Sequence, residues 1–193
     1  NEAVETVSYD PEGAKKLLEE SGWKDTDGDG YADKDGQKLT IDWLTYPTRL
    51  EQPKLAEYAQ ATLKEIGIDV VVNNTSDHMT YAADGDFDVY VSSTTTAPTG
   101  DPEYFFTSTV VGPKNYGKYE NKEVTALTEK LHQAFEPEER AKLATELQQK
   151  ILDDDGFFFV SHLNMGIVTK SNVKGMAAHP CDYYEITADL DVE

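Results

Sequence analysis

The chain has 193 residues, 38% of them hydrophobic and 28% charged, and its 37 Asp and Glu outnumber its 17 Lys and Arg for a formal net charge of −20. No apolar stretch approaches the ~20 residues that a membrane span needs, which excludes a transmembrane protein and favours a globular one. The negative charge repels phosphate backbones and anionic headgroups, which excludes nucleic acid and membrane surfaces as partners. The single cysteine, Cys181, excludes an internal disulfide.

A helix is predicted near the N-terminus, followed by an acidic loop. Asp10 is a favourable helix cap, Pro11 fits the first turn, and Gly22 is placed to end the helix. The stretch from Lys24 to Gln37 is rich in Gly and Asp and has no helical or strand period. We therefore expect one short amphipathic helix and then an exposed loop.

The next segment has the pattern of a strand, a helix and a second strand. Leu39–Tyr46 alternates apolar and polar residues, Pro53–Ile66 has helical spacing, and Ile68–Val72 is a β-branched run. Phe87–Val91 is a third candidate strand. A helix between two closely spaced strands is typical of a βαβ unit, which implies a parallel sheet.

The second half of the chain begins with a polar loop from Ser92 to Pro102. Two amphipathic helices follow, one carrying Val124 to Phe135 and the other carrying Leu143 to Ile151. Gly156–Val160 and Met165–Thr169 are predicted as two further strands. Because no linker or repeat interrupts the sequence, we expect a single α/β domain.

The acidic loop has the oxygen spacing of a calcium site. Carboxylates stand at its positions 1, 3, 5 and 9, a glycine stands at position 6, and a backbone carbonyl is available at position 7. Position 12 is Gly36 instead of the usual bidentate Glu, so an Asp-rich solvated turn is the competing interpretation. The residues of the possible structural calcium site are Asp25, Asp27, Asp29, Tyr31 and Asp33.

Catalytic patterns are absent from the sequence. The four histidines, His78, His132, His162 and His179, have no metal-ligand spacing; we expect His132 on a solvated helix face and His162 in a strand. No nucleophile is placed with a base and an orienting partner, and no nucleotide-binding motif occurs. We therefore expect no enzyme activity and no required cofactor.

The loop from Ser92 to Gly100 is the strongest candidate binding segment. It carries six hydroxyls and leaves the end of the third predicted strand. Ligands of open α/β sheets bind at the carboxyl ends of strands, and neutral hydroxyls suit a polar ligand. An ordinary loop held by Ser and Thr turns is the competing interpretation.

Several short motifs, taken in order, resemble one family. Tyr9–Leu18, Gly22-Trp23 and Asp27–Gly30 resemble the start of the C-terminal lobe of peptide/nickel-type solute-binding proteins of ABC importers. Further matching motifs are Phe87-Asp88, Gly100-Asp101-Pro102, Asn115-Tyr116-Gly117, Asn121, Glu139-Arg140-Ala141, Gln148, Ile151 and Val173-x-Gly175. Each motif is short, but their common order spans nearly the whole chain.

The resemblance implies a fold, a place in a longer protein, and partners. The expected fold is one lobe of a two-lobed periplasmic-binding-protein-like structure, with a mixed sheet flanked by helices. Residues 1–193 would be the C-terminal lobe, and a preceding N-terminal lobe would close on the ligand. Such a protein is a monomer that lies outside the cytoplasm, in the periplasm or lipid-anchored at a Gram-positive membrane, and delivers its solute to permease subunits.

The resemblance also bears on the ligand. Peptide-binding members usually have Trp and then Asp after the third strand, where this chain has Thr94 or Thr95 and then Ala97. Nickel-type members are similar to Thr94–Pro98, but their metal-contacting histidine has no counterpart in Gly112–Tyr116, so a metal would arrive already chelated. The expected ligand-binding residues are Thr94, Thr95, Thr96, Ala97, Thr99, Asn115 and Tyr116.

Three hypotheses about function follow. The first is capture of a nickel chelate or metallophore complex, and the second is capture of a short peptide in the same kind of protein. The third is a stand-alone interaction domain stabilised by calcium, which would unfold at a higher temperature when calcium is present.

Overall fold

The computed structural model describes residues 3–94, 97, 99–163, 166–178 and 186–193. Two compact units divide the chain. The sheet unit comprises Glu5–Thr94 and Asn115–Tyr119, and the helical unit comprises Asn1–Val4, Thr95–Lys114 and Glu120–Glu193. The helices of the second half pack mainly on one another, and the expectation of a single α/β domain stays a prediction.

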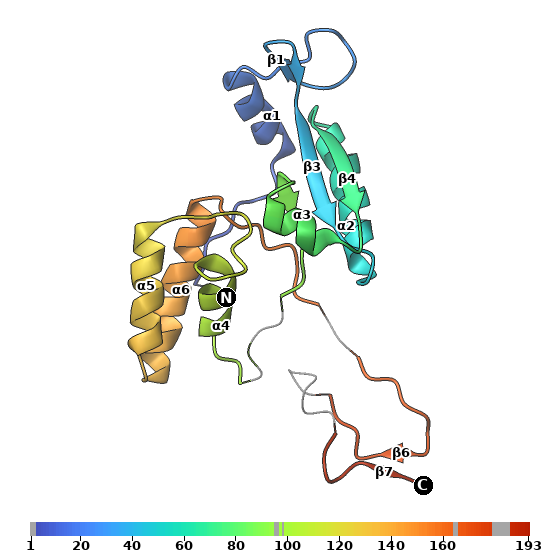
Figure 1. Ribbon diagram of the computed structural model, residues 1–193, viewed down its shortest axis with the longest axis vertical. Helices are drawn as coiled ribbons and strands as arrows, with labels where there is room; N and C mark the ends of the chain where they lie inside the picture. Colours follow the sequence, from blue (N-terminus) through green and yellow to red (C-terminus); the bar gives the residue numbers. More distant parts are fainter. Residues whose placement is uncertain (1–2, 95–96, 98, 164–165, 179–185) are drawn as a thin grey trace. The chain divides into compact units, whose positions relative to one another are not determined.

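The sheet unit is built around a parallel three-stranded sheet, with strand order β4-β3-β5. Thr40 of β3 pairs with Asp69 of β4, and Leu44 of β3 pairs with Tyr90 of β5. The elements in chain order are α1 (Pro11–Glu20), β1 (Asp33–Lys34), β2 (Gln37–Lys38), β3 (Thr40–Thr45), α2 (Glu51–Lys64), β4 (Asp69–Asn74), α3 (His78–Asp84) and β5 (Val89–Tyr90). Figure 1 shows α2 packed along β3 and β4.

Local chemistry explains the first helix and the return into β4. The Asp10 carboxylate accepts a hydrogen bond from the Gly13 amide at 2.9 Å, as expected of a helix cap. Gly67 has φ +85°, and a Cβ at this position would lie 3.1 Å from the Ala32 amide nitrogen. That amide donates to the Gly67 carbonyl at 2.7 Å, so the close approach ties the acidic loop to the turn between α2 and β4.

The core of the sheet unit lies between α2 and the sheet. Trp43, Ala56, Ile68 and Val70 form a buried cluster, against which partly buried side chains from α1, α2 and the strands pack. The predicted helix, strand, helix, strand and third strand are confirmed, with boundaries shifted by a few residues. The β1–β2 hairpin within the acidic loop and the helix α3 were not predicted.

The helical unit contains two long antiparallel helices and a shorter helical segment. These are α4 (Glu103–Phe105), the π-helix η1 (Phe106–Val110), α5 (Lys122–Gln133) and α6 (Pro137–Asp153), followed by the short antiparallel pair β6 (Val173–Lys174) and β7 (Asp191–Val192). Leu131 of α5 and Leu147 and Ile151 of α6 are fully buried. The two predicted amphipathic helices are therefore confirmed (Figure 1).

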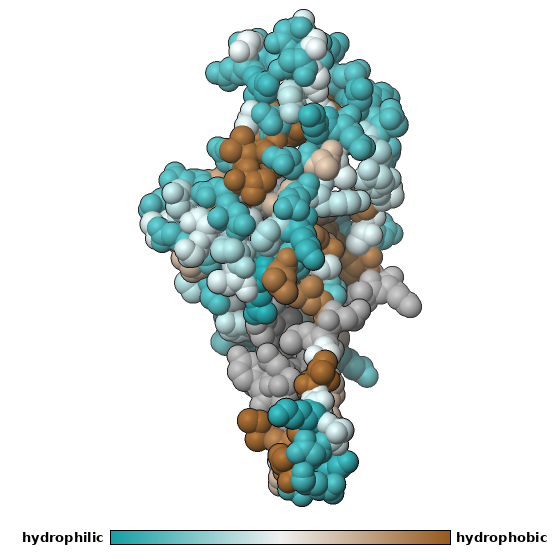
Figure 2. Space-filling view, turned by 90° about the vertical axis from the view of Figure 1, so that its right-hand side faces the viewer, coloured by the Kyte–Doolittle hydropathy of each residue, from teal (hydrophilic) through white to brown (hydrophobic). Residues whose placement is uncertain are grey.

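The two predicted strands near the C-terminus are wrong as far as the structure describes them. Gly156–Val160 and residues 166–169 form no strand and pair with none among the described residues, and Met165 lies outside these residues. Phe158 is 88% exposed and Val168 is 97% exposed. An apolar run predicts a strand only if another strand is present to pair with it, and residues 156–163, including His162, have none in the described ranges. Figure 2 shows hydrophobic residues at the surface near β6 and β7.

Trp43 gives a prediction about the core. Its indole nitrogen is buried and has no hydrogen-bond partner among the described residues. Trp43→Phe removes this unpaired donor, which offsets the cost of the smaller ring, so we expect a stability change below about 1 kcal/mol. Urea unfolding followed by circular dichroism measures it. A loss of roughly 3 kcal/mol, as for an ordinary large core truncation, would show that the indole N–H is paired.

Candidate functional site

The carboxyl edge of the parallel sheet gathers side chains from segments far apart in sequence. Tyr46 directly follows β3, Tyr90 ends β5, and His78 begins α3 after β4. Because parallel strands end at the same edge, these residues come together there. Figure 1 shows α3 next to the end of β3.

Aromatic rings form a continuous series along this edge. The rings of Tyr46 and His78 are stacked, with centroids 4.1 Å apart and planes 21° apart. His78 in turn lies 5.9 Å from Tyr90, and Tyr90 meets Tyr116 edge-on at 6.0 Å. Such offset and edge-on pairs are favourable geometries for aromatic side chains, so the series holds the edge in one arrangement.

The start of the Ser/Thr loop is fixed to the same edge. The Ser93 amide donates to the Tyr46 hydroxyl at 3.0 Å, and the Ser93 hydroxyl accepts from the Gln52 amide at 3.1 Å. Gln52 is buried, and its carbonyl oxygen accepts from the Thr45 hydroxyl at 3.3 Å. The loop therefore leaves β5 at a defined position next to the end of β3.

The predicted ligand-binding residues are spread over both units. Thr94 is exposed at the end of the sheet unit, whereas Ala97 and Thr99 belong to the helical unit. Thr95 and Thr96 lie outside the described residues. Thr94 directly follows Ser93, which the structure anchors at the sheet edge. The ligand-binding role of the loop residues stays a prediction.

Asn115 and Tyr116 lie in the sheet unit with different surroundings. The Asn115 amide group donates to the Tyr119 carbonyl at 2.8 Å, and its oxygen accepts from the Tyr119 amide at 2.9 Å. Asn115 therefore closes its own turn, while Tyr116 joins the aromatic series through Tyr90. Of the predicted pair, Tyr116 is the one in contact with the aromatic series, and the binding role of both residues stays a prediction.

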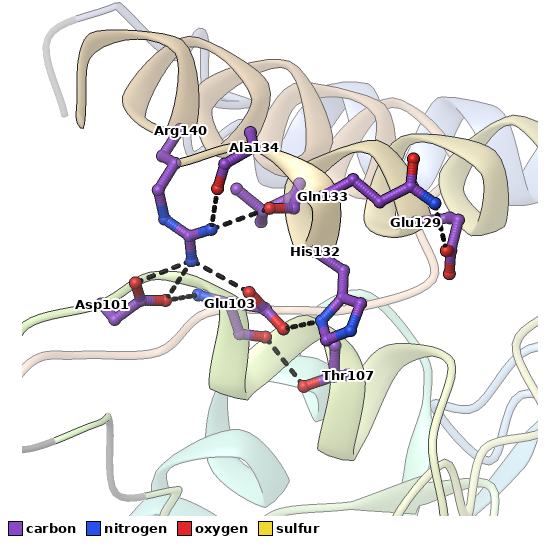
Figure 3. A network of polar contacts seen from close by, with 9 residues as sticks. Asp101, Glu103, Thr107, Glu129, His132, Gln133, Ala134 and Arg140 are labelled. Atoms are coloured by element: carbon purple, nitrogen blue, oxygen red, sulfur yellow. Dashed lines mark hydrogen bonds and ion pairs between the residues drawn. The ribbon is translucent and has the colours of Figure 1, made fainter. Parts of the chain in front are cut away.

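A charged network fixes the far end of the loop within the helical unit (Figure 3). Nη2 of Arg140 donates to both Asp101 carboxylate oxygens at 2.7 Å and to Glu103 at 2.9 Å. Nη1 of Arg140 donates to the carbonyls of Leu131 and Ala134, at 2.8 and 2.7 Å, at the end of α5. The guanidinium thus connects the start of α4 with the end of α5, so two motifs whose residues Asp101 and Arg140 are 39 positions apart form one ion pair.

Glu103 also pairs with His132, whose Nδ1 lies 2.7 Å from its carboxylate (Figure 3). The hydrogen bonds from His132 and Arg140 lower the pKa of Glu103, and the bond to Glu103 raises the pKa of His132. Burial raises the pKa of Asp101, but hydrogen bonds from the Glu103 amide and Arg140 outweigh it, so the net shift is downward. His132 is 65% exposed, as its predicted place on a solvated helix face requires.

Three carboxylates of the acidic loop converge, with Asp25, Asp27 and Asp29 each offering an oxygen within 4.8 Å of the others. The same carboxylates accept hydrogen bonds from loop amides, among them those of Gly28 and Tyr31. Figure 2 shows hydrophilic residues at the surface of the end of the sheet unit that carries the acidic loop.

Asp33, the fourth predicted carboxylate ligand, is not part of this cluster. It accepts hydrogen bonds from the Thr26 amide at 2.8 Å and the Thr26 hydroxyl at 2.6 Å. Three of the predicted ligands could therefore hold a hard cation, and Asp33 instead closes the loop. A structural calcium stays a prediction, tested by whether the unfolding temperature rises with calcium and falls with a chelator.

The carboxylates of the acidic loop also predict that the stability of the fold depends on pH. The Thr26 hydrogen bonds lower the pKa of Asp33 below 3.8, and the Lys38 hydrogen bond lowers the pKa of Asp29 in the same way. Groups with a depressed folded pKa stabilise the fold above their unfolded pKa, and this contribution is lost as the pH falls below about 4. Thr26→Val removes the hydroxyl, so we expect the pKa of Asp33 to rise in carboxyl-detected NMR. Asp29 is the internal control, and an unchanged Asp33 would contradict the assignment.

Sequence reasoning missed several residues of the sheet edge, namely Tyr46, Gln52, His78 and Tyr90. His78 was considered for metal spacing alone, and no motif connects it with Tyr46 or Tyr90. For Tyr46, Tyr90 and Gln52 the available signal was position, because they lie at or near the end of a predicted strand or just before a predicted helix. His78 begins α3, which was not predicted, so it had no such signal.

The fold and this edge define the class of protein, namely a lobe of a periplasmic-binding-protein fold. Residues 1–117 match the bacterial extracellular solute-binding proteins, family 5 Middle. The match covers more than half of the chain, so the chain belongs to this family. The predicted family and the predicted α/β fold class are both confirmed. The name of the family describes solute-binding proteins, and a relative such as AppA is named as an oligopeptide-binding protein.

Relatives include proteins with different named ligands. The chain is 29% identical over 189 residues to the oligopeptide-binding protein AppA of Bacillus subtilis (strain 168), covering 95% of this chain and 35% of that protein. It is 34% identical over 110 residues to the nickel-binding periplasmic protein of Escherichia coli (strain K12), covering 56% of this chain and 21% of that protein. The chain therefore spans about a third or less of the length of these relatives.

Solved structures agree with this assignment. AppA from Bacillus subtilis in complex with a nonapeptide superposes with a TM-score of 0.78 at 28% identity, covering 92% of this chain and 36% of that one. A nickel ABC transporter structure from Bacillus halodurans superposes with a TM-score of 0.65 at 27% identity, covering 79% and 32%. Among the described residues, no helix combines the length and apolar character needed to cross a membrane.

Proposed function

We propose that this chain is the C-terminal lobe of the substrate-binding component of an ABC importer, and that it captures a small polar solute outside the membrane. The observation that carries the proposal is the carboxyl edge of the sheet, where Tyr46, Ser93 and the aromatic series meet at the start of the Ser/Thr loop. This is the edge at which open α/β folds bind ligands. Family membership supports the same function.

The solute class has two candidates. A nickel chelate or metallophore complex agrees with the nickel-binding relatives and with the Thr94–Pro98 motif. A short peptide agrees with AppA, whose similarity covers more of this chain. Hydroxyls, amide groups and an imidazole at the sheet edge suit either solute, because both present oxygen atoms as hydrogen-bond acceptors.

The proposed function requires two kinds of partner, a second lobe of the same protein and the permease subunits of the importer. A second lobe of the same protein would face the sheet edge and close over the solute, since half of a cleft leaves the solute in water and binds weakly. The loaded protein, a monomer, would then deliver the solute to permease subunits from the periplasm or the outer face of a Gram-positive membrane. No step of this cycle requires catalysis or a cofactor.

Mass spectrometry of the natural gene product that contains these residues tests the proposal. We expect a small solute to co-purify with it and to be reduced several-fold when Thr94, Thr95 and Thr96 are all replaced by Ala. Thr169→Ala, at an exposed position outside the loop, is the matched control. Cargo that is equal in the triple variant and the control would contradict the role of the loop.

A further inference from the structure

His78 is held rigidly at the sheet edge by its two neighbours. One face of its ring is covered by the stacked ring of Tyr46. Its Nδ1 lies 2.7 Å from the Tyr90 hydroxyl oxygen, so this nitrogen is already engaged. With a stacked face and a fixed Nδ1, the imidazole has a defined orientation.

The direction of the Tyr90 hydrogen bond determines which imidazole nitrogen carries the proton. The Tyr90 hydroxyl also lies 3.9 Å from the Met79 sulfur, a weak and distant acceptor. The imidazole nitrogen is the stronger acceptor and is much closer, so donation from the hydroxyl to Nδ1 is favoured. Burial raises the pKa of Tyr90 to about 12, so the phenol keeps its proton, and burial lowers the pKa of His78, so its ring is neutral near pH 7.

A neutral imidazole that accepts at Nδ1 carries its proton on Nε2. His78 is half-buried, and its Nε2 has no partner among the described residues. This N–H lies at the same edge as Tyr46, which holds the start of the Ser/Thr loop through Ser93. The site thus holds a preorganised donor in need of an acceptor.

We propose that His78 is a solute-contacting residue whose Nε2–H donates a hydrogen bond to a carbonyl or carboxylate oxygen of the solute. The inference rests on the proposed function and narrows it to solutes with such an oxygen, either a peptide or a carboxylate-bearing metal chelate. The protonated Nε2 has no lone pair for a metal, so His78 does not bind a bare nickel ion.

NMR measures the tautomer without any solute. In ¹⁵N-detected spectra of the imidazole at pH 7, we expect His78 as the Nε2–H tautomer. In Tyr90→Phe, which keeps the ring and removes the hydroxyl, we expect a shift toward a mixture of tautomers. A His78 that carries its proton on Nδ1 would overturn the proposal.

Binding measurements on the natural gene product test the contact itself, with trialanine, nickel citrate and nickel ion alone as probes in calorimetry. His78→Phe keeps a ring for stacking on Tyr46 and removes the donor, so binding of the oxygen-bearing probe should weaken about tenfold, the effect of one hydrogen bond. His78→Gln places an amide N–H near the Nε2 position and should stay within about threefold of the wild type.

The outcomes separate the two proposals. Equal weakening in His78→Gln and His78→Phe would show a structural role only, and nickel alone bound through His78 would show a metal ligand; either result overturns the inference. Failure of the wild type to bind either oxygen-bearing probe would count against the proposed function, and the tautomer measurement would still decide whether Nε2 can donate.

Discussion

Leu44→Ala should lower the free energy of unfolding of the sheet unit by about 3 kcal/mol, the usual cost of a large core truncation. Leu44 is 1% exposed and lies on β3, the central strand of the sheet, with β4 on one side and β5 on the other. Removing its side chain leaves a cavity that strands paired on both sides cannot close by moving. Urea unfolding followed by tryptophan fluorescence measures the effect, because both tryptophans, Trp23 and Trp43, belong to the sheet unit.

Leu17→Ala is the matched control, because it makes the same chemical change in the same unit. Leu17 on α1 is 65% exposed, so its removal should cost less than about 1 kcal/mol. Equal losses in the two variants would mean that the central strand is not buried as described.

Arg140→Ala has the second large expected effect, a loss of roughly 2 to 3 kcal/mol from the helical unit. Its side chain is 16% exposed and donates to two carboxylates and to two carbonyls at the end of α5. Removing it leaves the carboxylates of Asp101 and Glu103 close together without their cation, and the two carbonyls without this donor. Thermal unfolding followed by circular dichroism at the helix band is the measurement.

Arg140→Lys separates charge from geometry. A lysine keeps the positive charge but lacks the planar fork that contacts both carboxylates and both carbonyls, so it should recover less than half of the loss. Lys142→Ala, an exposed change on the same helix, should stay within about 0.5 kcal/mol of the wild type. Full recovery by lysine would contradict the importance of the bonds to the α5 carbonyls.

Elements whose signals are local were predictable from the sequence. The apolar alternation of Leu39–Tyr46, the helical spacing of Pro53–Ile66 and the β-branched run Ile68–Val72 lie next to one another and specify a βαβ unit. Asp10 and Pro11 specify the start of α1 for the same reason, since a cap depends on its nearest neighbours.

Features that depend on a distant partner were not predictable in this way. Gly156–Val160 has the composition of a strand but no partner strand in the described residues. The composition of a segment does not indicate whether another strand is available to pair with it. The same reason explains His78, since its contacts with Tyr46 and Tyr90 depend on how α3 packs against the strand ends. Asp101 and Arg140 were noted as separate motifs, and only the fold shows that they form one ion pair.

A crystal structure of the natural gene product with its co-purified small molecule bound is the most direct measurement. We expect the molecule to lie between the carboxyl edge of this sheet and another lobe of the same protein, with an oxygen atom near Nε2 of His78. An edge covered by the protein's own side chains, with the molecule bound elsewhere or absent, would contradict it.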